Sequence, residues 1–310
     1  MSASTRMADR VAAYLAERRR NGFGMSISGG QLAAFARFAD SRGHSGPITL
    51  ALASESALSS EGRRPLTAAR RIEVLRGFAR FCVRYDEATV IPPRRLFGRS
   101  RRRLRPHIYT DAEIARLMAM ARRLGGLRGA TCATIFGLIA ACGLRIREAT
   151  RLARTDVNLS EGLLFIRETK FGKSRWVPLH PSVVVALRRY VKVRDADSRS
   201  AARSAFFTFD HGRSASSVNV RYAFWPLRSH LGPPRGGHLH VRLHDLRHTF
   251  LCRRLEQWYG EGRQIDRHML SLSTYVGHVK VTDTYWYMTA TPELLALAAQ
   301  RAQQVAGRRP

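Results

Sequence analysis

Several residues in the second half of the chain are suited to chemistry on a phosphodiester. Arg145 follows the pair Gly143-Leu144, and His244 and Arg247 stand three residues apart beside an apolar helical stripe. His278 and the triplet Tyr285-Trp286-Tyr287 come later. Guanidinium groups bind phosphate oxygens through paired, charge-assisted hydrogen bonds. Each residue alone is a weak signal, and their joint order carries the information.

Metal and nucleotide chemistry are less well supported. Four histidines lie close in sequence and could suggest zinc, but they have no cysteine partners and no HExxH pattern: His238, His240, His244 and His248. No Walker loop is present, and the Gly-rich stretch 22–30 follows a helical segment rather than a strand. Acidic residues are scattered, which argues against a two-metal nuclease.

The charge of the chain points to a polyanionic partner. The 310 residues include 53 Lys and Arg against 23 Asp and Glu, giving a net charge of +30. Nucleic acid is the leading candidate, although a basic surface that serves only solubility is the alternative. The sequence has no run of 18 apolar residues, so no membrane-spanning helix is predicted. The four cysteines lie far apart without a CxxC pair, so we expect free thiols in a reducing cytoplasm.

Helical patterns dominate the first part of the chain. Residues 1–90 contain short amphipathic segments and a longer one from Thr67 to Tyr85, which predicts a small all-α domain. Residues 91–106 then combine three prolines with seven arginines, a composition that breaks helix and repels itself. We expect a basic linker lying along phosphates, the alternative being a merely solvated spacer.

Residues 107–310 predict a second, larger domain. Thr110 and Glu113 form a capping-box pattern before a helix, and a mostly apolar helix runs from Ala130 to Cys142. Residues 162–168 and 174–179 favour two strands joined by a basic turn. The rest is mainly helical, so the expected fold class is mainly α, with an α+β second domain that holds a small β-hairpin.

The motif order resembles that of the tyrosine recombinase (phage-integrase-like) family. Over the second domain, GLRIREA resembles the first-arginine motif, TKFGKSRWVPL the hairpin-lysine motif and LHDLRHTF the His-x-x-Arg motif. VGHVKVTDTYWY resembles the last-histidine and nucleophile motif, with Tyr287 nine residues after His278. The closing segment is most similar to transposon and Xer-type recombinases. One departure is Arg147, where the family commonly has a small residue.

The resemblance implies a metal-free phosphoryl transfer by Arg145, Lys170, His244, Arg247, His278 and Tyr287. Tyr287 would be the nucleophile, and Tyr285, two residues away, would point elsewhere. The arginines and His278 would stabilise the phosphate, and His244 could accept the tyrosine proton. Alignment on VPL selects Lys170 over Lys173 as the proton donor to the 5′-oxygen.

The resemblance also implies partners and rival functions. Duplex DNA would be the substrate, with four protomers assembling on two sites, possibly with sister recombinases, in the bacterial cytoplasm on the nucleoid. Residues 291–298 predict a short amphipathic helix that would dock on a neighbour, or else pack on its own domain. No metal or nucleotide cofactor is expected. The rivals are a type IB topoisomerase and a non-catalytic DNA-binding accessory factor.

Overall fold

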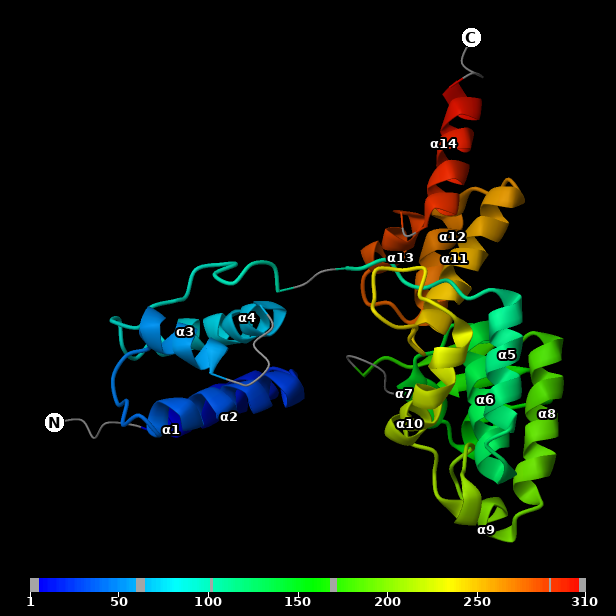
Figure 1. The fold of residues 1–310 in the computed structure, drawn as a ribbon, viewed down its shortest axis with the longest axis horizontal. Coiled ribbons are helices and arrows are strands. Elements are labelled where there is room, and N and C mark those ends of the chain that lie inside the picture. Colours follow the sequence, from blue (N-terminus) through cyan, green and yellow to red (C-terminus); the bar gives the residue numbers. More distant parts are fainter. Residues whose placement is uncertain (1–5, 60–64, 101–102, 168–171, 290, 307–310) are drawn as a thin grey trace. The chain divides into compact units, whose positions relative to one another are not determined.

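The computed structural model describes residues 6–59, 65–100, 103–167, 172–289 and 291–306, apart from a few side chains near the C-terminus (Figure 1). The chain divides into two compact units, Met1–Arg103 and Leu104–Pro310. Within both units helices predominate, and the strands described belong to the second. Among the described residues, none of the helices combines the length and apolar character needed to cross a membrane.

The first unit is a set of helices around one apolar core: α1 (Met7–Arg20), α2 (Ser26–Asp40), α3 (Leu50–Leu58) and α4 (Pro65–Cys82). Thr49 caps α3 by accepting a hydrogen bond from the Leu52 amide at 3.1 Å. Phe35 and Phe78 pack edge to face in the buried centre. The helices expected in this part of the chain are therefore present, and their apolar faces form its core.

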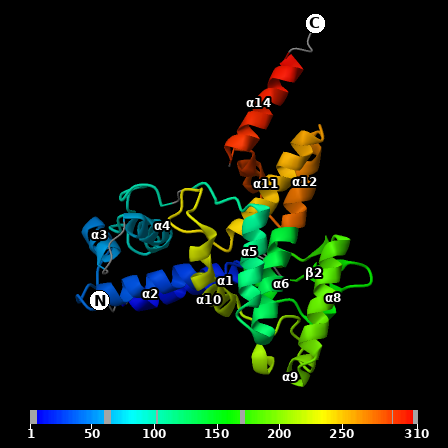
Figure 2. The same ribbon diagram turned by 45° about the vertical axis from the view of Figure 1, so that its right-hand side comes forward.

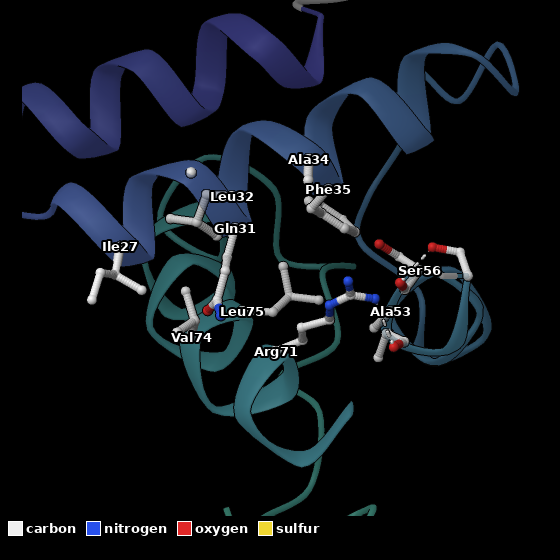
Figure 3. Close-up of a pocket in the computed structure, with 13 residues that line it drawn as sticks. Ile27, Gln31, Leu32, Ala34, Phe35, Ala53, Ser56, Arg71, Val74 and Leu75 are labelled. Atoms are coloured by element: carbon white, nitrogen blue, oxygen red, sulfur yellow. Dashed lines mark hydrogen bonds between the residues drawn. The ribbon is translucent and has the colours of Figure 1, made fainter. Parts of the chain in front are cut away.

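A pocket of about 340 Å³ lies among α2, α3 and α4 (Figure 3). Its wall is mostly apolar, with Ile27, Leu32 and Val74 on one side and Ala53 near Ser56 on the other. The Arg71 guanidinium reaches across it and donates to the Ala57 carbonyl at 3.1 Å. That contact ties α4 to the C-terminal end of α3.

The basic segment between the units is anchored to each of them. Leu96 and Phe97 pack on the apolar core of the first unit. At the other end, the Gly237 amide donates to the Arg105 carbonyl at 2.9 Å. A Cβ on Gly236 would come within 2.4 Å of the same carbonyl, so this loop accepts the segment only because residue 236 lacks a side chain. The basic segment, expected to lie along phosphates or else to be a solvated spacer, therefore makes specific packing contacts at both ends.

The second unit is built around the buried helix α6 (Gly126–Cys142). Helix α5 (Asp111–Arg122) and helix α8 (Pro181–Asp195) pack against it, as Figures 1 and 2 both show. The predicted capping box is present at the start of α5, where Thr110 and Glu113 exchange hydrogen bonds. Short segments complete this part: α7 (Ile146–Thr150), η1 (Arg154–Asp156), α9 (Ser198–Ala201) and η3 (Asp210–Gly212).

A small antiparallel sheet of order β1-β2-β3 lies beside these helices. Its strands are β1 (Val157–Asn158), β2 (Leu163–Ile166) and β3 (Arg175–Pro178). Leu164 and Val177 face each other across the predicted hairpin, and both are buried. The two-residue strand β1 was not expected, because it is too short to show an alternating pattern.

The end of the chain forms a second apolar cluster within the same unit. It involves the helices α11 (Asp245–Gly260), α12 (Ile265–Val276) and α14 (Pro292–Ala306). The remaining elements of this part of the chain are α10 (Ser217–Leu227), η4 (Arg228–Leu231), α13 (Thr282–Tyr285) and η5 (Trp286–Thr289). Leu294 of α14 is fully buried in the cluster. The rest of α14 extends away from its unit (Figures 1 and 2).

Candidate active site

The first arginine of the site is fixed where α6 gives way to α7. Gly143 ends α6 in the left-handed region at φ +62°, and a Cβ there would come within 2.5 Å of Phe250. Arg145 then stands at the N-cap of α7. Its Nη1 donates to Oε1 of Glu148 at 2.7 Å, and its amide donates to Oε2 at 3.0 Å. The side chain is about one third exposed, so the guanidinium retains access to solvent.

The second arginine is buried. Arg247 lies on the first turn of α11 and is 1% exposed. Its Nη1 donates to the Gly143 carbonyl at 2.6 Å, and its Nη2 donates to the Val276 carbonyl at 2.8 Å. Burial, together with the charge of Arg145, lowers the pKa of Arg247 to about 9, which still leaves it cationic at neutral pH.

Both arginines meet at the C-terminal end of α12. Arg145 donates from Nη2 to the Gly277 carbonyl at 2.8 Å and from Nη1 to the Val276 carbonyl at 3.4 Å. Gly277 ends this helix at φ +70°. The exposed carbonyls of a helix C-terminus carry partial negative charge and favour cations. The end of α12 therefore holds two guanidinium groups side by side, a geometry suited to a phosphate.

A buried carboxylate balances part of this positive charge. Glu148 accepts from Arg145 and also from Arg175 of β3, whose Nη2 lies 2.9 Å from Oε2. Burial opposes ionisation of Glu148, but the hydrogen bond and charge of Arg175 lower its pKa below the usual value. Arg175 Nε in turn donates to the Tyr275 carbonyl at 2.7 Å. This network joins α7, β3 and α12 around Arg145.

Tyr287 lies beside the arginine pair on η5 and is only 4% exposed. Its hydroxyl is hydrogen-bonded to Nδ1 of His248 at 2.7 Å. The His278 ring is parallel to the phenol, with centroids 6.1 Å apart, and its Nδ1 lies 2.7 Å from Thr284 Oγ1. Burial, followed by the charges of Arg247 and Arg145, lowers the pKa of His278 to about 3. His278 is therefore a neutral group at physiological pH.

His244 is at the solvent-exposed edge of the same group. It precedes α11 and packs edge to face on His248, with ring centroids 4.7 Å apart. Crowding by protein atoms and the charges of Arg247 and Arg242 lower the pKa of His244 to about 4. It is thus neutral at physiological pH, as a proton acceptor must be. The hydroxyl of Tyr287, however, is hydrogen-bonded to Nδ1 of the neighbouring His248.

The structure places the other expected residues as follows. Lys170 lies outside the described residues, and Lys173, at the end of the same turn, is exposed. Arg147 is exposed on α7. The Tyr285 hydroxyl donates to Asp266 at 3.2 Å and lies away from the contacts made by Tyr287. Among the described residues, no group of three His, Cys, Asp or Glu side chains is arranged to hold a metal, which gives the zinc alternative no support.

Three residues of this site were not singled out from the sequence: Glu148, Arg175 and His248. Glu148 had a detectable signal, since it stands three residues after Arg145 at a helix start. Arg175 is one of many arginines, and nothing in its spacing identifies its partner. His248 was considered only as one of four histidines, and it stands one helical turn after His244.

Comparison with known proteins identifies relatives of the chain. The family model described as "Phage integrase family" matches residues 108–293. The protein y4rE of Sinorhizobium fredii, described as a candidate integrase/recombinase, is 37% identical over 299 residues that cover 96% of each chain. Tyrosine recombinase XerA of Thermococcus kodakarensis is 28% identical over 76% of this chain and 74% of its own.

Solved structures show the same fold. The integrase of transposon Tn1549, in complex with transposon right end DNA, has a TM-score of 0.70 at 16% identity and covers 97% of this chain and 100% of its own. XerH bound to its difH substrate has a TM-score of 0.66 at 17% identity, over 89% and 79% of the two chains. The mainly helical fold class and the resemblance noted in the motifs are thereby confirmed. The chain belongs to the phage integrase family and is a tyrosine recombinase.

Proposed function

We propose that this recombinase cleaves and rejoins DNA strands at specific sites through a covalent 3′-phosphotyrosyl link to Tyr287. The observation that carries the proposal is the pair of guanidinium groups, Arg145 and Arg247, held on the carbonyls that end α12. The Tyr287 hydroxyl is bonded to a histidine that follows Arg247 directly on α11. This arrangement brings a phosphate site and a nucleophile into one region of the second unit.

The reaction follows from these groups. The Tyr287 oxygen attacks phosphorus and loses its proton, a P–O bond to tyrosine forms, and the P–O5′ bond breaks. Negative charge that develops on the non-bridging oxygens is stabilised by Arg145 and Arg247. The neutral rings of His244 and His278 stand beside the same phosphate, and Lys170 gives a proton to the departing 5′-oxygen. Because the new link is also a phosphate ester, rejoining by the reverse reaction needs no ATP.

The buried position of Tyr287 means that its hydroxyl has to move to reach a DNA phosphate. The residue sits in η5, a helical turn of four residues. A turn of this length has few internal hydrogen bonds, so its movement breaks little secondary structure. We infer that binding of DNA moves this turn toward the arginine pair.

Charge and fold support a clamp on duplex DNA. The net charge of +30 favours a partner with many phosphates. Residues 1–90 would bind the core of the site, residues 91–106 would follow the backbone as a basic linker, and residues 107–310 would cut. The related integrase of Tn1549 was solved with transposon DNA, which supports a role in a mobile element.

A tetramer on two DNA sites is the assembly that we infer for strand exchange. The first turn of α14 packs on its own unit through Leu294, whereas Leu295 is 42% exposed. The alternative that the tail helix packs on its own domain therefore holds for its beginning. The outer part of α14 would dock on the neighbouring protomer, and sister recombinases could occupy some positions of the tetramer.

Covalent trapping tests the proposal. Wild-type protein and Tyr287→Phe are incubated in EDTA with fragments of the host genome that include the regions flanking the gene, and the reactions are stopped with SDS. We expect protein-linked fragments with the wild type only, and sequencing their ends gives the site. Absence of wild-type adducts, both alone and in an extract of the host, would favour a DNA-binding accessory factor. Relaxation of plasmids without recombinant products would favour the topoisomerase activity.

A further inference from the structure

His248, rather than His244, makes the direct contact with the nucleophile. Its Nδ1 lies 2.7 Å from the Tyr287 hydroxyl, and the two rings are 5.4 Å apart at 39°. We propose that His248 is a further catalytic residue, which accepts the proton of Tyr287 as the tyrosine oxygen attacks the phosphate. This inference rests on the proposed function, because it assigns a role within the same reaction.

The surroundings of His248 restrict its ring to one position. It stands on α11, a helix whose first turn is fixed by the buried Arg247. Trp286 packs edge to face on the ring at 6.1 Å, and His244 packs in the same way at 4.7 Å. With aromatic rings on several sides, Nδ1 is held toward the phenol, as a group that takes a proton in the transition state must be.

The charges that face His248 keep it neutral before DNA arrives. Burial lowers its pKa to about 2, and the positive charges of Arg242 and Arg247, with the nearby His244, act in the same direction. In the tautomer protonated at Nε2, the Nδ1 lone pair accepts the hydrogen bond from the tyrosine. The nucleophile is therefore already hydrogen-bonded to its acceptor in the free protein, and the proposed role requires that this bond is kept when η5 moves toward the arginine pair.

The same environment makes proton transfer depend on substrate. A histidine beside arginines is a weak base, so the phenol stays protonated while the site holds no phosphate. A bound phosphodiester brings a negative charge against Arg145 and Arg247, which offsets their effect on His248 and raises its proton affinity. The nucleophile thus becomes reactive only when its target is in place.

The proton balance is complete without another co-reactant. The O–H bond of Tyr287 breaks and its proton moves to Nδ1 of His248, giving an imidazolium ion. The tyrosine oxygen forms the bond to phosphorus while the P–O5′ bond breaks, and the 5′-oxygen takes its proton from the lysine. In the rejoining step His248 returns the proton to Tyr287, by microscopic reversibility.

The test compares two replacements of His248 on the DNA fragment to which the wild type becomes linked. His248→Asn keeps an oxygen close to the position of Nδ1 and can accept a hydrogen bond, but an amide does not take the proton. His248→Ala removes both functions and leaves space for added imidazole. His268→Asn is the matched control, because the ring contact of His268 is with Trp258 and not with Tyr287. Thermal unfolding and DNA affinity of each variant show that the proteins are folded.

The measured quantity is the single-turnover rate of adduct formation. We expect His248→Ala to be slowed about 100-fold or more, which is the usual contribution of a general base. We expect His248→Asn to be nearly as slow, and His268→Asn to match the wild type. Added imidazoles should accelerate His248→Ala in the order of their basicity, which a merely structural role would not produce.

The outcomes separate this inference from the proposed function. If His248→Asn or His248→Ala reacts at the wild-type rate while Tyr287→Phe forms no adduct, the proton-acceptor role is wrong and the tyrosine chemistry stands. Rescue by imidazoles that is independent of their basicity also overturns the role. If the wild type itself forms no adduct in any condition, both proposals fail together.

Discussion

Arg145 and Arg247 donate to the same carbonyl oxygen, that of Val276, from 3.4 Å and 2.8 Å. Two like charges are thus brought together before any phosphate is bound. The cost of that approach is reduced by the carbonyls at the end of α12 and by the carboxylate of Glu148. In the proposed reaction, a phosphate that enters the site would meet guanidinium groups already in place, which is the arrangement that electrostatic catalysis requires.

Removal of the Glu148 charge should impair catalysis more than folding. Glu148→Gln keeps the shape of the side chain but loses its ion pairs with Arg145 and Arg175. We expect the rate of adduct formation to fall about 10- to 100-fold, the loss typical of residues that orient the side chains which contact the ligand. Glu148→Ala leaves Arg175 buried without its carboxylate and should destabilise the protein by about 3–5 kcal/mol. Single-turnover kinetics and urea unfolding measure the two effects, and a wild-type rate for Glu148→Gln would contradict the role.

Replacement of Arg247 by lysine should not preserve activity. The guanidinium of Arg247 donates to the Gly143 and Val276 carbonyls through two different nitrogens. An ammonium group cannot keep both bonds and also contact a phosphate with the same planar geometry. We expect Arg247→Lys to lower the rate of adduct formation about 100-fold or more. Arg254→Lys, at a partly exposed position of the same helix, is the control. Equal rates for both variants would argue against a role of Arg247 in binding the phosphate.

The glycine that ends α6 should tolerate no side chain. Gly143→Ala would combine a left-handed backbone with a Cβ 2.5 Å from Phe250. Gly262 has a similar φ of +71°, but a Cβ added there would meet no atom within 4 Å, so this position isolates the backbone contribution. We expect Gly262→Ala to cost about 1 kcal/mol and Gly143→Ala clearly more, by urea unfolding. Equal losses would mean that Phe250 moves aside without cost.

Stability should fall in acid because partly buried histidines are held neutral in the fold. The pKa of His248 is lowered to about 2 and that of His278 to about 3, whereas an unfolded histidine titrates near about 6.5. Between these values the unfolded chain binds more protons than the folded protein does. The free energy of unfolding is therefore highest above about pH 6.5 and decreases as the pH falls toward 3. His248→Asn should show a shallower decrease than the wild type over about pH 6.5–4.5. Parallel curves for the two proteins would contradict the assigned pKa shift.

DNA affinity should depend steeply on salt. A protein that contacts 6–10 phosphates loses about 10³–10⁵ in affinity between roughly 50 and 200 mM salt. With a net charge of +30, we expect this chain to lie in that range. Fluorescence anisotropy with Tyr287→Phe, which binds without cutting, gives the slope. A binding constant that stays flat over this interval would be incompatible with a phosphate clamp.

The sequence predicts the helices and the order of the motifs because those properties are local. The capping box at Thr110, the helix that ends at Gly143 and the hairpin all follow from short-range patterns. The carbonyl partners of Arg145 and Arg247 could not be predicted, since every residue type offers a carbonyl. The contact between His248 and Tyr287 depends on how α11 is turned against η5, a tertiary property that spacing alone does not define.

The backbone origin of the carbonyl partners has a consequence for how this site tolerates mutation. The oxygens that hold the two arginines belong to the main chain of Gly143, Val276 and Gly277, so exchange of the Val276 side chain does not delete its carbonyl. Substitution at position 276 is limited by packing alone, whereas at the two glycines it is limited both by the left-handed backbone and by close contacts with Phe250 and Arg175. A single replacement therefore cannot delete any of the three carbonyls, and it can displace them only where it disturbs the backbone, as at the two glycines.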